Sequence, residues 1–240
     1  MTCSLLQATD SLAMNWQPNL VACLGADLRY LSLHFEWPGV RPLGSAWIRD
    51  TYFTGELHDA STILADCAQA LSYLSSHAIV HNNVTPYTIV YVRAGAKGKA
   101  VLTDFDCAMS TSGTYDSTIS NPCYVAPEAI KQNSEYADVW SLGIVMLFAM
   151  KVTGLPGTPE HIRTLGKNRE QHMTSWHKQV DEFASTMNTS VDSTEGSELR
   201  QIVKLMLEAT IMDTESETAS VRISPTELGN RTKKWASMFS

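Results

Sequence analysis

The chain has 240 residues, 44% of them hydrophobic, which is enough for one domain with a sizeable core or for two small domains. Its formal net charge is -7 and only 18 residues are Lys or Arg, whereas a protein that grips nucleic acid through its phosphates normally carries a basic excess. This composition argues against nucleic acid as a partner and indicates an ordinary solvated, acidic surface.

Targeting signals and membrane segments are not apparent in the sequence. No basic residue occurs in Met1-Thr2-Cys3-Ser4, and no sustained apolar run follows it. The longest apolar run, Leu142 to Met150, is too short to span a bilayer. An odd number of cysteines without paired metal-ligand spacing indicates reduced thiols, namely Cys3, Cys23, Cys67, Cys107 and Cys123. We therefore expect an intracellular, cytoplasmic protein without a membrane partner.

The first predicted elements are extended. Residues 17–25 read as a turn followed by a strand, and residues 27–35 alternate apolar and polar side chains as a second strand does. Trp37-Pro38-Gly39 breaks this pattern. Residues 38–60 are rich in Gly, Pro and aromatic residues, and they predict no regular element.

A helix and a hairpin follow. Residues 61–77 predict an amphipathic helix whose apolar stripe consists of Ile63, Cys67, Leu71 and Leu74. Two short strands are then predicted at 89–92 and 100–103, on either side of a turn at Gly95–Gly98.

The second half of the chain is predicted to be helical. Residues 135–150 are apolar on nearly every face, as expected of a buried helix. The order of strands, one helix, a hairpin and then mostly helices is an α+β pattern weighted towards helix. Further helices are predicted at 159–165, at 171–185, at 199–207 and from Pro225, with Ser224 as its cap.

Three motifs stand in order along the chain. The first is His81-Asn82-Asn83-Val84-Thr85-Pro86-Tyr87-Thr88. The second runs from Thr103-Asp104-Phe105-Asp106-Cys107-Ala108 to Tyr124-Val125-Ala126-Pro127-Glu128, and the third is Asp138-Val139-Trp140-Ser141-Leu142-Gly143. They resemble, in that order, the catalytic loop, the segment from Asp-Phe-Gly to Ala-Pro-Glu and the buried-helix motif of the protein kinase superfamily.

The resemblance implies a protein kinase-like fold of α+β class. Residues 1–36 would be a short remnant of the N-lobe, with the end of the regulatory helix and two strands, and residues 37–240 would form the mainly helical C-lobe. The implied position of the turn at Pro18 puts the strand Lys and the Gly-rich loop upstream of Met1, and no Gly-x-Gly-x-x-Gly occurs in the sequence. We therefore expect a truncated N-lobe.

The catalytic-loop positions depart from the family pattern. Phosphoryl transfer needs a carboxylate base, a Lys that neutralises the moving phosphate and metal ligands. The resemblance places Asn83 at the base, Thr85 at the Lys and Thr88 at the metal-binding Asn. An amide cannot take a proton as a carboxylate does, and a general base typically contributes ~10²–10⁴-fold. Asn82 replaces the Arg that reads a phosphate on the activation segment. We therefore expect no catalytic residue in this loop.

Asp104 matches the metal-binding Asp of the family's Asp-Phe-Gly, and Asp106 stands in place of its Gly. A carboxylate at position 104 could hold a divalent ion, as a vestigial metal ligand, or it could only cap the hairpin. We expect neither ATP nor Mg²⁺ as a cofactor, and the alternative is residual binding of both.

The remaining matches are structural. His81 and Phe105 match the hydrophobic spine between kinase lobes, and Leu12 and Cys23 are candidates for its upper part. Asp138 matches the residue that anchors the catalytic-loop backbone. Glu128 and Arg222 match a buried ion pair, and loss of one partner of such a pair costs ~3–5 kcal/mol.

These observations predict a pseudokinase, a catalytically impaired kinase-like protein that regulates kinase signalling by binding a protein, either a kinase or a kinase substrate. One alternative is a weak or atypical ATP-dependent protein kinase of the Ser/Thr type. A second alternative is an incomplete gene model of a longer kinase-like protein.

Overall fold

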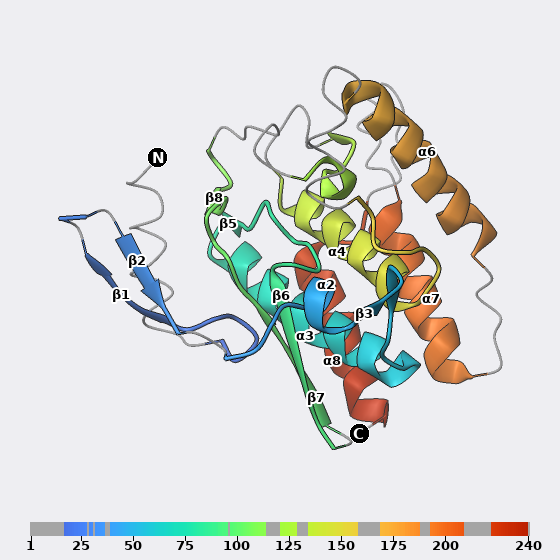
Figure 1. Cartoon of the computed structure of the whole chain (residues 1–240), viewed down its shortest axis with the longest axis horizontal. Helices are drawn as coiled ribbons and strands as arrows, with labels where there is room; N and C mark the ends of the chain where they lie inside the picture. The colour runs from blue at the N-terminus through green and yellow to red at the C-terminus, as the bar shows by residue number, and fades with distance from the viewer. Residues whose placement is uncertain are drawn as a thin grey trace.

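The fold is a helical body that carries small antiparallel sheets (Figure 1). The predicted α+β class is confirmed. The computed structural model describes residues 17–27, 29–30, 32–36, 39–95, 97–113, 121–128, 134–157, 169–187, 193–208 and 222–239.

The first two strands form a hairpin at one side of the body (Figure 1). Strand β1 (Cys23–Asp27) pairs antiparallel with β2 (Ser32–Phe35). The root of the hairpin is joined to the rest of the fold, because the Val21 N–H donates to the Leu102 carbonyl at 3.0 Å. Both predicted strands are confirmed, but β1 extends two residues beyond its predicted end at residue 25 and β2 is shorter than predicted. The predicted break at residues 37–38 and the expected helix end before residue 17 lie outside the described residues.

The segment from 39 to 56 holds short elements that the sequence did not predict. They are α2 (Leu43–Ala46), β3 (Ile48–Arg49) and β4 (Tyr52–Phe53). Tertiary contacts hold them in place: the Gly44 N–H donates to the Pro86 carbonyl at 2.7 Å. A Cβ at Gly44 would lie 3.1 Å from the Tyr87 ring, so this close approach favours glycine. The prediction of an irregular segment was therefore wrong here, because elements this short contain no periodicity to detect.

Helix α3 (Leu57–Ser76) begins earlier than predicted. Its predicted apolar stripe, from Ile63 to Leu74, is buried. The first turn is stabilised by a capping box in which Glu56 and Asp59 each accept a hydrogen bond from the other's backbone N–H. The helix start therefore depends on capping rather than on the apolar repeat.

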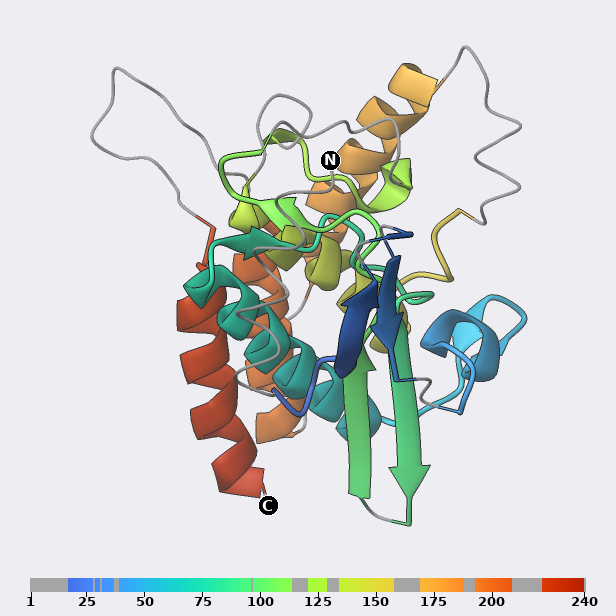
Figure 2. The same ribbon diagram turned by 90° about the vertical axis from the view of Figure 1, so that its left-hand side faces the viewer.

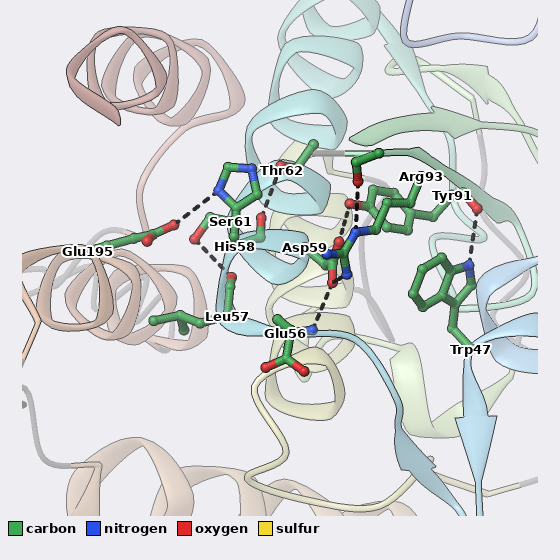
Figure 3. Close-up of polar contacts among 11 residues, drawn as sticks. Trp47, Glu56, Leu57, His58, Asp59, Ser61, Thr62, Tyr91, Arg93 and Glu195 are labelled. Atoms are coloured by element: carbon green, nitrogen blue, oxygen red, sulfur yellow. Dashed lines mark hydrogen bonds and ion pairs between the residues drawn. The ribbon is translucent and has the colours of Figure 1, made fainter. Parts of the chain in front are cut away.

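Asp59 also joins α3 to strand β6 (Ile89–Ala94), as Figure 3 shows. This carboxylate is 1% exposed. It accepts from the Tyr91 hydroxyl at 2.7 Å and from Arg93 Nη1 at 3.0 Å. Trp47 Nε1 donates to the Tyr91 carbonyl at 3.1 Å and so connects α2 and β3 to the same strand. The buried charge at Asp59 is thus paired and fully hydrogen-bonded, as a buried carboxylate requires.

Two strand pairs position the loops of the candidate site. Strand β6 pairs with β7 (Lys97–Leu102), and the two extend beside the helices as a hairpin (Figure 2). Strand β5 (Ile79–Val80) pairs with β8 (Met109–Ser110). The loop 81–88, which follows β5, therefore lies against the segment 103–108, which follows β7.

The core of the body is α4 (Glu135–Ala149), which is buried along nearly its whole length. The predicted buried helix is confirmed, and Ser134 caps it by accepting from the Tyr136 N–H at 3.3 Å. Among the described residues, no helix combines the length and apolar character needed to cross a bilayer. The predicted helix at 159–165 lies outside the described residues, whereas the later ones are confirmed as α6 (Arg169–Thr186), α7 (Thr194–Leu207) and α8 (Pro225–Phe239), the last capped by Ser224.

Candidate functional site

Asp138 of α4 anchors the backbone of loop 81–88. This buried carboxylate accepts from the His81 N–H at 2.6 Å and from the Asn82 N–H at 2.8 Å. Burial raises the pKa of Asp138 to about 7, and the two N–H donors oppose that rise. Asn82 has a φ of 61°, in the left-handed region that Asn tolerates better than most residues. Asp138 thus fixes the loop in an unusual backbone conformation.

His81 is fully buried and uses both ring nitrogens. Nε2 lies 3.1 Å from the Thr103 carbonyl, which can only accept, so Nε2 carries the proton. Nδ1 accepts from the Asn83 N–H at 3.3 Å. Burial lowers the pKa of His81 to about 4, and the imidazole is therefore neutral at physiological pH.

Three aromatic rings pack in a row between the β1–β2 hairpin and the loop. The Phe105 ring lies 4.9 Å from His81 and 5.8 Å from Phe35, measured between ring centroids. Sequence reasoning missed Phe35. The alternating pattern of residues 27–35 was the signal that could have placed it on the inner face of its strand. Cys23 is the cross-strand neighbour of Phe35, and Leu12 lies outside the described residues.

Thr85 and Thr88 face inwards and bind the loop's own backbone. Both are buried, with exposed fractions of 5% and 3%. The Thr88 hydroxyl donates to the Asn83 carbonyl at 2.7 Å and accepts from the Thr85 N–H at 3.0 Å. The Thr85 hydroxyl accepts from the Tyr87 N–H at 3.2 Å. These hydroxyls therefore stabilise the turn of the loop.

Asp104 lies opposite Asn83. The Asn83 side-chain amide donates to Asp104 Oδ2 at 3.2 Å, and the Asp106 N–H lies 3.5 Å from Asp104 Oδ1. Asp104 and Asp106 are both exposed, and Asp104 has a left-handed φ of 64°. Partial burial, and secondarily the charge of Asp106, raises the pKa of Asp104.

The donor set fits a kinase-type magnesium site poorly. Mg²⁺ demands oxygen ligands in near-ideal octahedral geometry. Of the two positions that match the family's metal ligands, Asp104 supplies a carboxylate, but the Thr88 hydroxyl donates to the Asn83 carbonyl and is turned into the loop. Within the described ranges, no group of three or more His, Cys, Asp or Glu side chains could hold a metal ion.

The far end of the segment is held by Glu128 and Arg222. The Arg222 side chain is fully buried, and Nη1 donates to Glu128 Oε1 while Nη2 donates to Oε2 at 3.3 Å. The guanidinium also donates to the Tyr136 carbonyl at 3.1 Å and to the Glu208 carbonyl at 3.0 Å. It therefore joins the end of the segment to the start of α4 and the end of α7.

The backbone just before Glu128 is also secured by side chains. The consecutive carbonyls of residues 123–125 accept, in order, from Trp176 Nε1 at 2.8 Å, Ser141 Oγ at 2.5 Å and His177 Nε2 at 2.9 Å. Trp176 and His177 belong to α6, whereas Ser141 belongs to α4. This end of the segment is thus fixed by two different helices.

Comparisons with known proteins agree with this arrangement. The protein kinase domain family model matches residues 14–220. The chain is 34% identical over 98 residues to MAP kinase-activated protein kinase 2 of Drosophila melanogaster. This match covers 38% of this chain and 27% of that protein. It is 31% identical over 102 residues to the CaM kinase-like vesicle-associated protein of Danio rerio. This match covers 42% of this chain and 23% of that protein. It is 29% identical over 90 residues to calcium/calmodulin-dependent protein kinase type 1 of Caenorhabditis briggsae. This match covers 36% of this chain and 25% of that protein. Each match spans about a quarter of the relative's length.

Proposed function

The chain belongs to the protein kinase domain family, and on that premise we propose that it is a pseudokinase, which regulates kinase signalling by binding another protein. The observation that carries the proposal is the contact between Asn83 and Asp104. At the position where the family has a base, a neutral amide donates a hydrogen bond to the carboxylate that would bind metal.

The chemistry of the loop supports this proposal. A general base must accept the proton of the substrate hydroxyl, and the side-chain nitrogen of an amide has no basic lone pair for it. Thr85 has no charge with which to neutralise a transferred phosphoryl group, and its hydroxyl accepts from the Tyr87 N–H. The Thr88 hydroxyl likewise binds the Asn83 carbonyl instead of a metal ion. The proposed function therefore needs neither ATP nor Mg²⁺.

The scaffold around this loop favours a binding role. Phe105, which packs on His81, and the Glu128–Arg222 pair hold the two ends of the segment 104–128 in place. These fixed ends on a helical lobe offer a preorganised surface, which lowers the cost of association. We propose that a protein kinase or a kinase substrate binds there, inside the cell. The names of the relatives, a MAP kinase-activated kinase and a calmodulin-dependent kinase, support a place in kinase signalling.

The proposal includes a division of the chain. Residues 1–36 would belong to the kinase N-lobe, and residues 37–240 would be the C-lobe that presents the binding surface. The hairpin of β1 and β2 would then serve chiefly to cover Phe105 through the Phe35 ring.

The second candidate is a weak or atypical ATP-dependent Ser/Thr kinase. The exposed carboxylates of Asp104 and Asp106 favour it, since a divalent ion could reach them from solvent. A ligand that binds the folded state must raise its melting temperature, so thermal unfolding separates the two candidates. We expect millimolar ATP with Mg²⁺ or Mn²⁺ to leave the Tm of the full chain unchanged. A rise in Tm that Asp104→Ala abolishes would contradict the proposal and support the kinase.

A further inference from the structure

Three consecutive side chains of the loop each donate a hydrogen bond to the segment that follows β7. His81 Nε2 donates to the Thr103 carbonyl at 3.1 Å, and Asn83 Nδ2 donates to Asp104 Oδ2 at 3.2 Å. Between them in sequence, Asn82 Nδ2 donates to the Cys107 carbonyl at 3.3 Å. These contacts bracket Phe105, whose ring lies between His81 and Phe35.

The donors at all three positions are neutral. His81 is uncharged at physiological pH, and an amide carries no charge. A metal ion bound to Asp104 would instead hold this carboxylate through its positive charge, and it would offset the negative charge there. The amide of Asn83 holds it through a hydrogen bond and leaves the negative charges of Asp104 and Asp106 to solvent, since both residues are exposed.

We propose that Asn82 and Asn83 form a metal-independent latch that keeps the segment 104–107 docked, with Phe105 inserted, in the absence of any cation or nucleotide. This inference rests on the proposed function, because a docked segment is what gives a partner a constant surface to bind. It is a regulatory property of the chain: the docked state needs no ligand to form.

Backbone geometry at both ends of the latch supports its role. Asn82 and Asp104 have φ values of 61° and 64°, a region that costs most side chains but that Asn and Asp tolerate. The Asn82 N–H is fixed by Asp138 of α4, so the loop side of the latch is rooted in the buried helix. The Ala108 N–H donates to the Phe105 carbonyl at 3.0 Å, and it closes the docked segment on its other side.

Hydrogen exchange of the full chain tests the latch directly. We expect the amides of residues 104–108 in the wild-type protein to exchange at the same rate in EDTA and in millimolar Mg²⁺ or Mn²⁺. In Asn83→Ala and in Asn82→Ala these amides should exchange faster, with α4 unaffected. Slower wild-type exchange on addition of the metal alone, or unchanged exchange in both variants, would overturn the latch.

The substitution Asn83→Asp provides a second test, in which the cation requirement should appear. It replaces the amide with a carboxylate next to Asp104 and Asp106, so like charges repel until a cation joins them. We expect a Tm in EDTA lower by about 2–4 °C, recovered by Mn²⁺ or Mg²⁺. The matched control is Gln201→Glu, the same chemical change on the exposed face of α7, which should show neither effect.

A variant Asn83→Asp whose Tm equals that of the wild type in EDTA would overturn the proposal. Both experiments contain no nucleotide and no protein partner. If the chain proved to be an active kinase, the proposed function would fail while the exchange and melting results still decided whether the latch exists.

Discussion

Arg222 lies fully buried against Glu128, a residue 94 positions earlier in the chain. The same guanidinium donates to the carbonyls of Tyr136 and Glu208, so burial of its charge is offset by an ion pair and by two further acceptors. Burial nevertheless lowers the pKa of Arg222, and Glu128 acts in the opposite direction. The pair ties the activation-segment end to two helices of the body.

Substitution of Arg222 with Met should destabilise the protein strongly. The change leaves Glu128 and the carbonyls of Tyr136 and Glu208 without their donor, and loss of one partner of a buried pair costs about 3–5 kcal/mol. Urea unfolding followed by circular dichroism measures the change. The exposed pair of Glu227 and Arg231 is the control, because Arg231→Gln should cost less than about 1 kcal/mol. Equal effects of the two substitutions would show that the buried pair has no special role.

The substitution Asp138→Asn should weaken the anchoring of loop 81–88 and destabilise the protein. The carboxylate accepts two backbone N–H groups, whereas the amide has one oxygen and would turn an N–H₂ towards the second donor. We expect a loss of about 2–3 kcal/mol in the free energy of unfolding. The control is Asp181→Asn at an exposed position on α6, which should leave the free energy of unfolding nearly unchanged. Comparable losses in both variants would argue against the anchoring role of Asp138.

The stability of the protein should depend on the charge of His81 at acidic pH. The pKa of His81 falls from 6.5 to about 4 on folding, so between these values the unfolded state binds the extra proton. Lowering the pH through this window therefore removes stability, on the order of 3 kcal/mol by pH 4. The pKa of Asp138 rises from 3.8 to about 7, and its contribution has the opposite sign, being lost as pH rises through that range.

The variant His81→Phe separates these two effects. It keeps a ring against Phe105 and keeps the backbone N–H that Asp138 accepts, but it removes the titrating group. Unfolding free energies of both proteins, measured from pH 7 to pH 4, should converge as the pH falls. A constant difference across that range would contradict the assignment of a neutral, buried His81.

Tyr91→Phe tests the anchor between β6 and α3. The change removes the hydroxyl that donates to buried Asp59 and leaves one carboxylate oxygen with fewer partners. A loss of about 1–3 kcal/mol is expected, because a buried acceptor that loses its donor is costly. Tyr52→Phe, at a tyrosine that is 52% exposed, is the matched control. Identical unfolding curves for wild type and Tyr91→Phe would contradict the stabilising role of this contact between β6 and α3.

The long elements of the fold could be predicted because their periodicity is strong. Helix α4 and the β6–β7 hairpin lie close to their predicted bounds, and the stripe of α3 is buried as its spacing indicates. The start of α3 could not be predicted from apolar spacing, since Glu56 and Asp59 define it by capping. Helix α2 escaped prediction because it is set by contacts with residues distant in sequence, such as Pro86.

The contacts of the candidate site were likewise predicted only in part. The family resemblance predicted that Glu128 and Arg222 form a pair, and the two side chains are in contact. The bond between Asn83 and Asp104 was not predicted, because it depends on a left-handed backbone at Asp104 that no sequence pattern specifies. The Phe35 ring was missed for a related reason: which strand residue reaches Phe105 depends on how the hairpin sits over the loop.

We propose that this kinase-family chain does not transfer phosphoryl groups. The most direct measurement is transfer of labelled phosphate from ATP, with Mg²⁺ or Mn²⁺, to the chain itself and to a generic protein substrate, comparing wild type with Asp104→Ala. We expect the same background signal from both proteins. Sustained phosphorylation by the wild type that Asp104→Ala abolishes would contradict it.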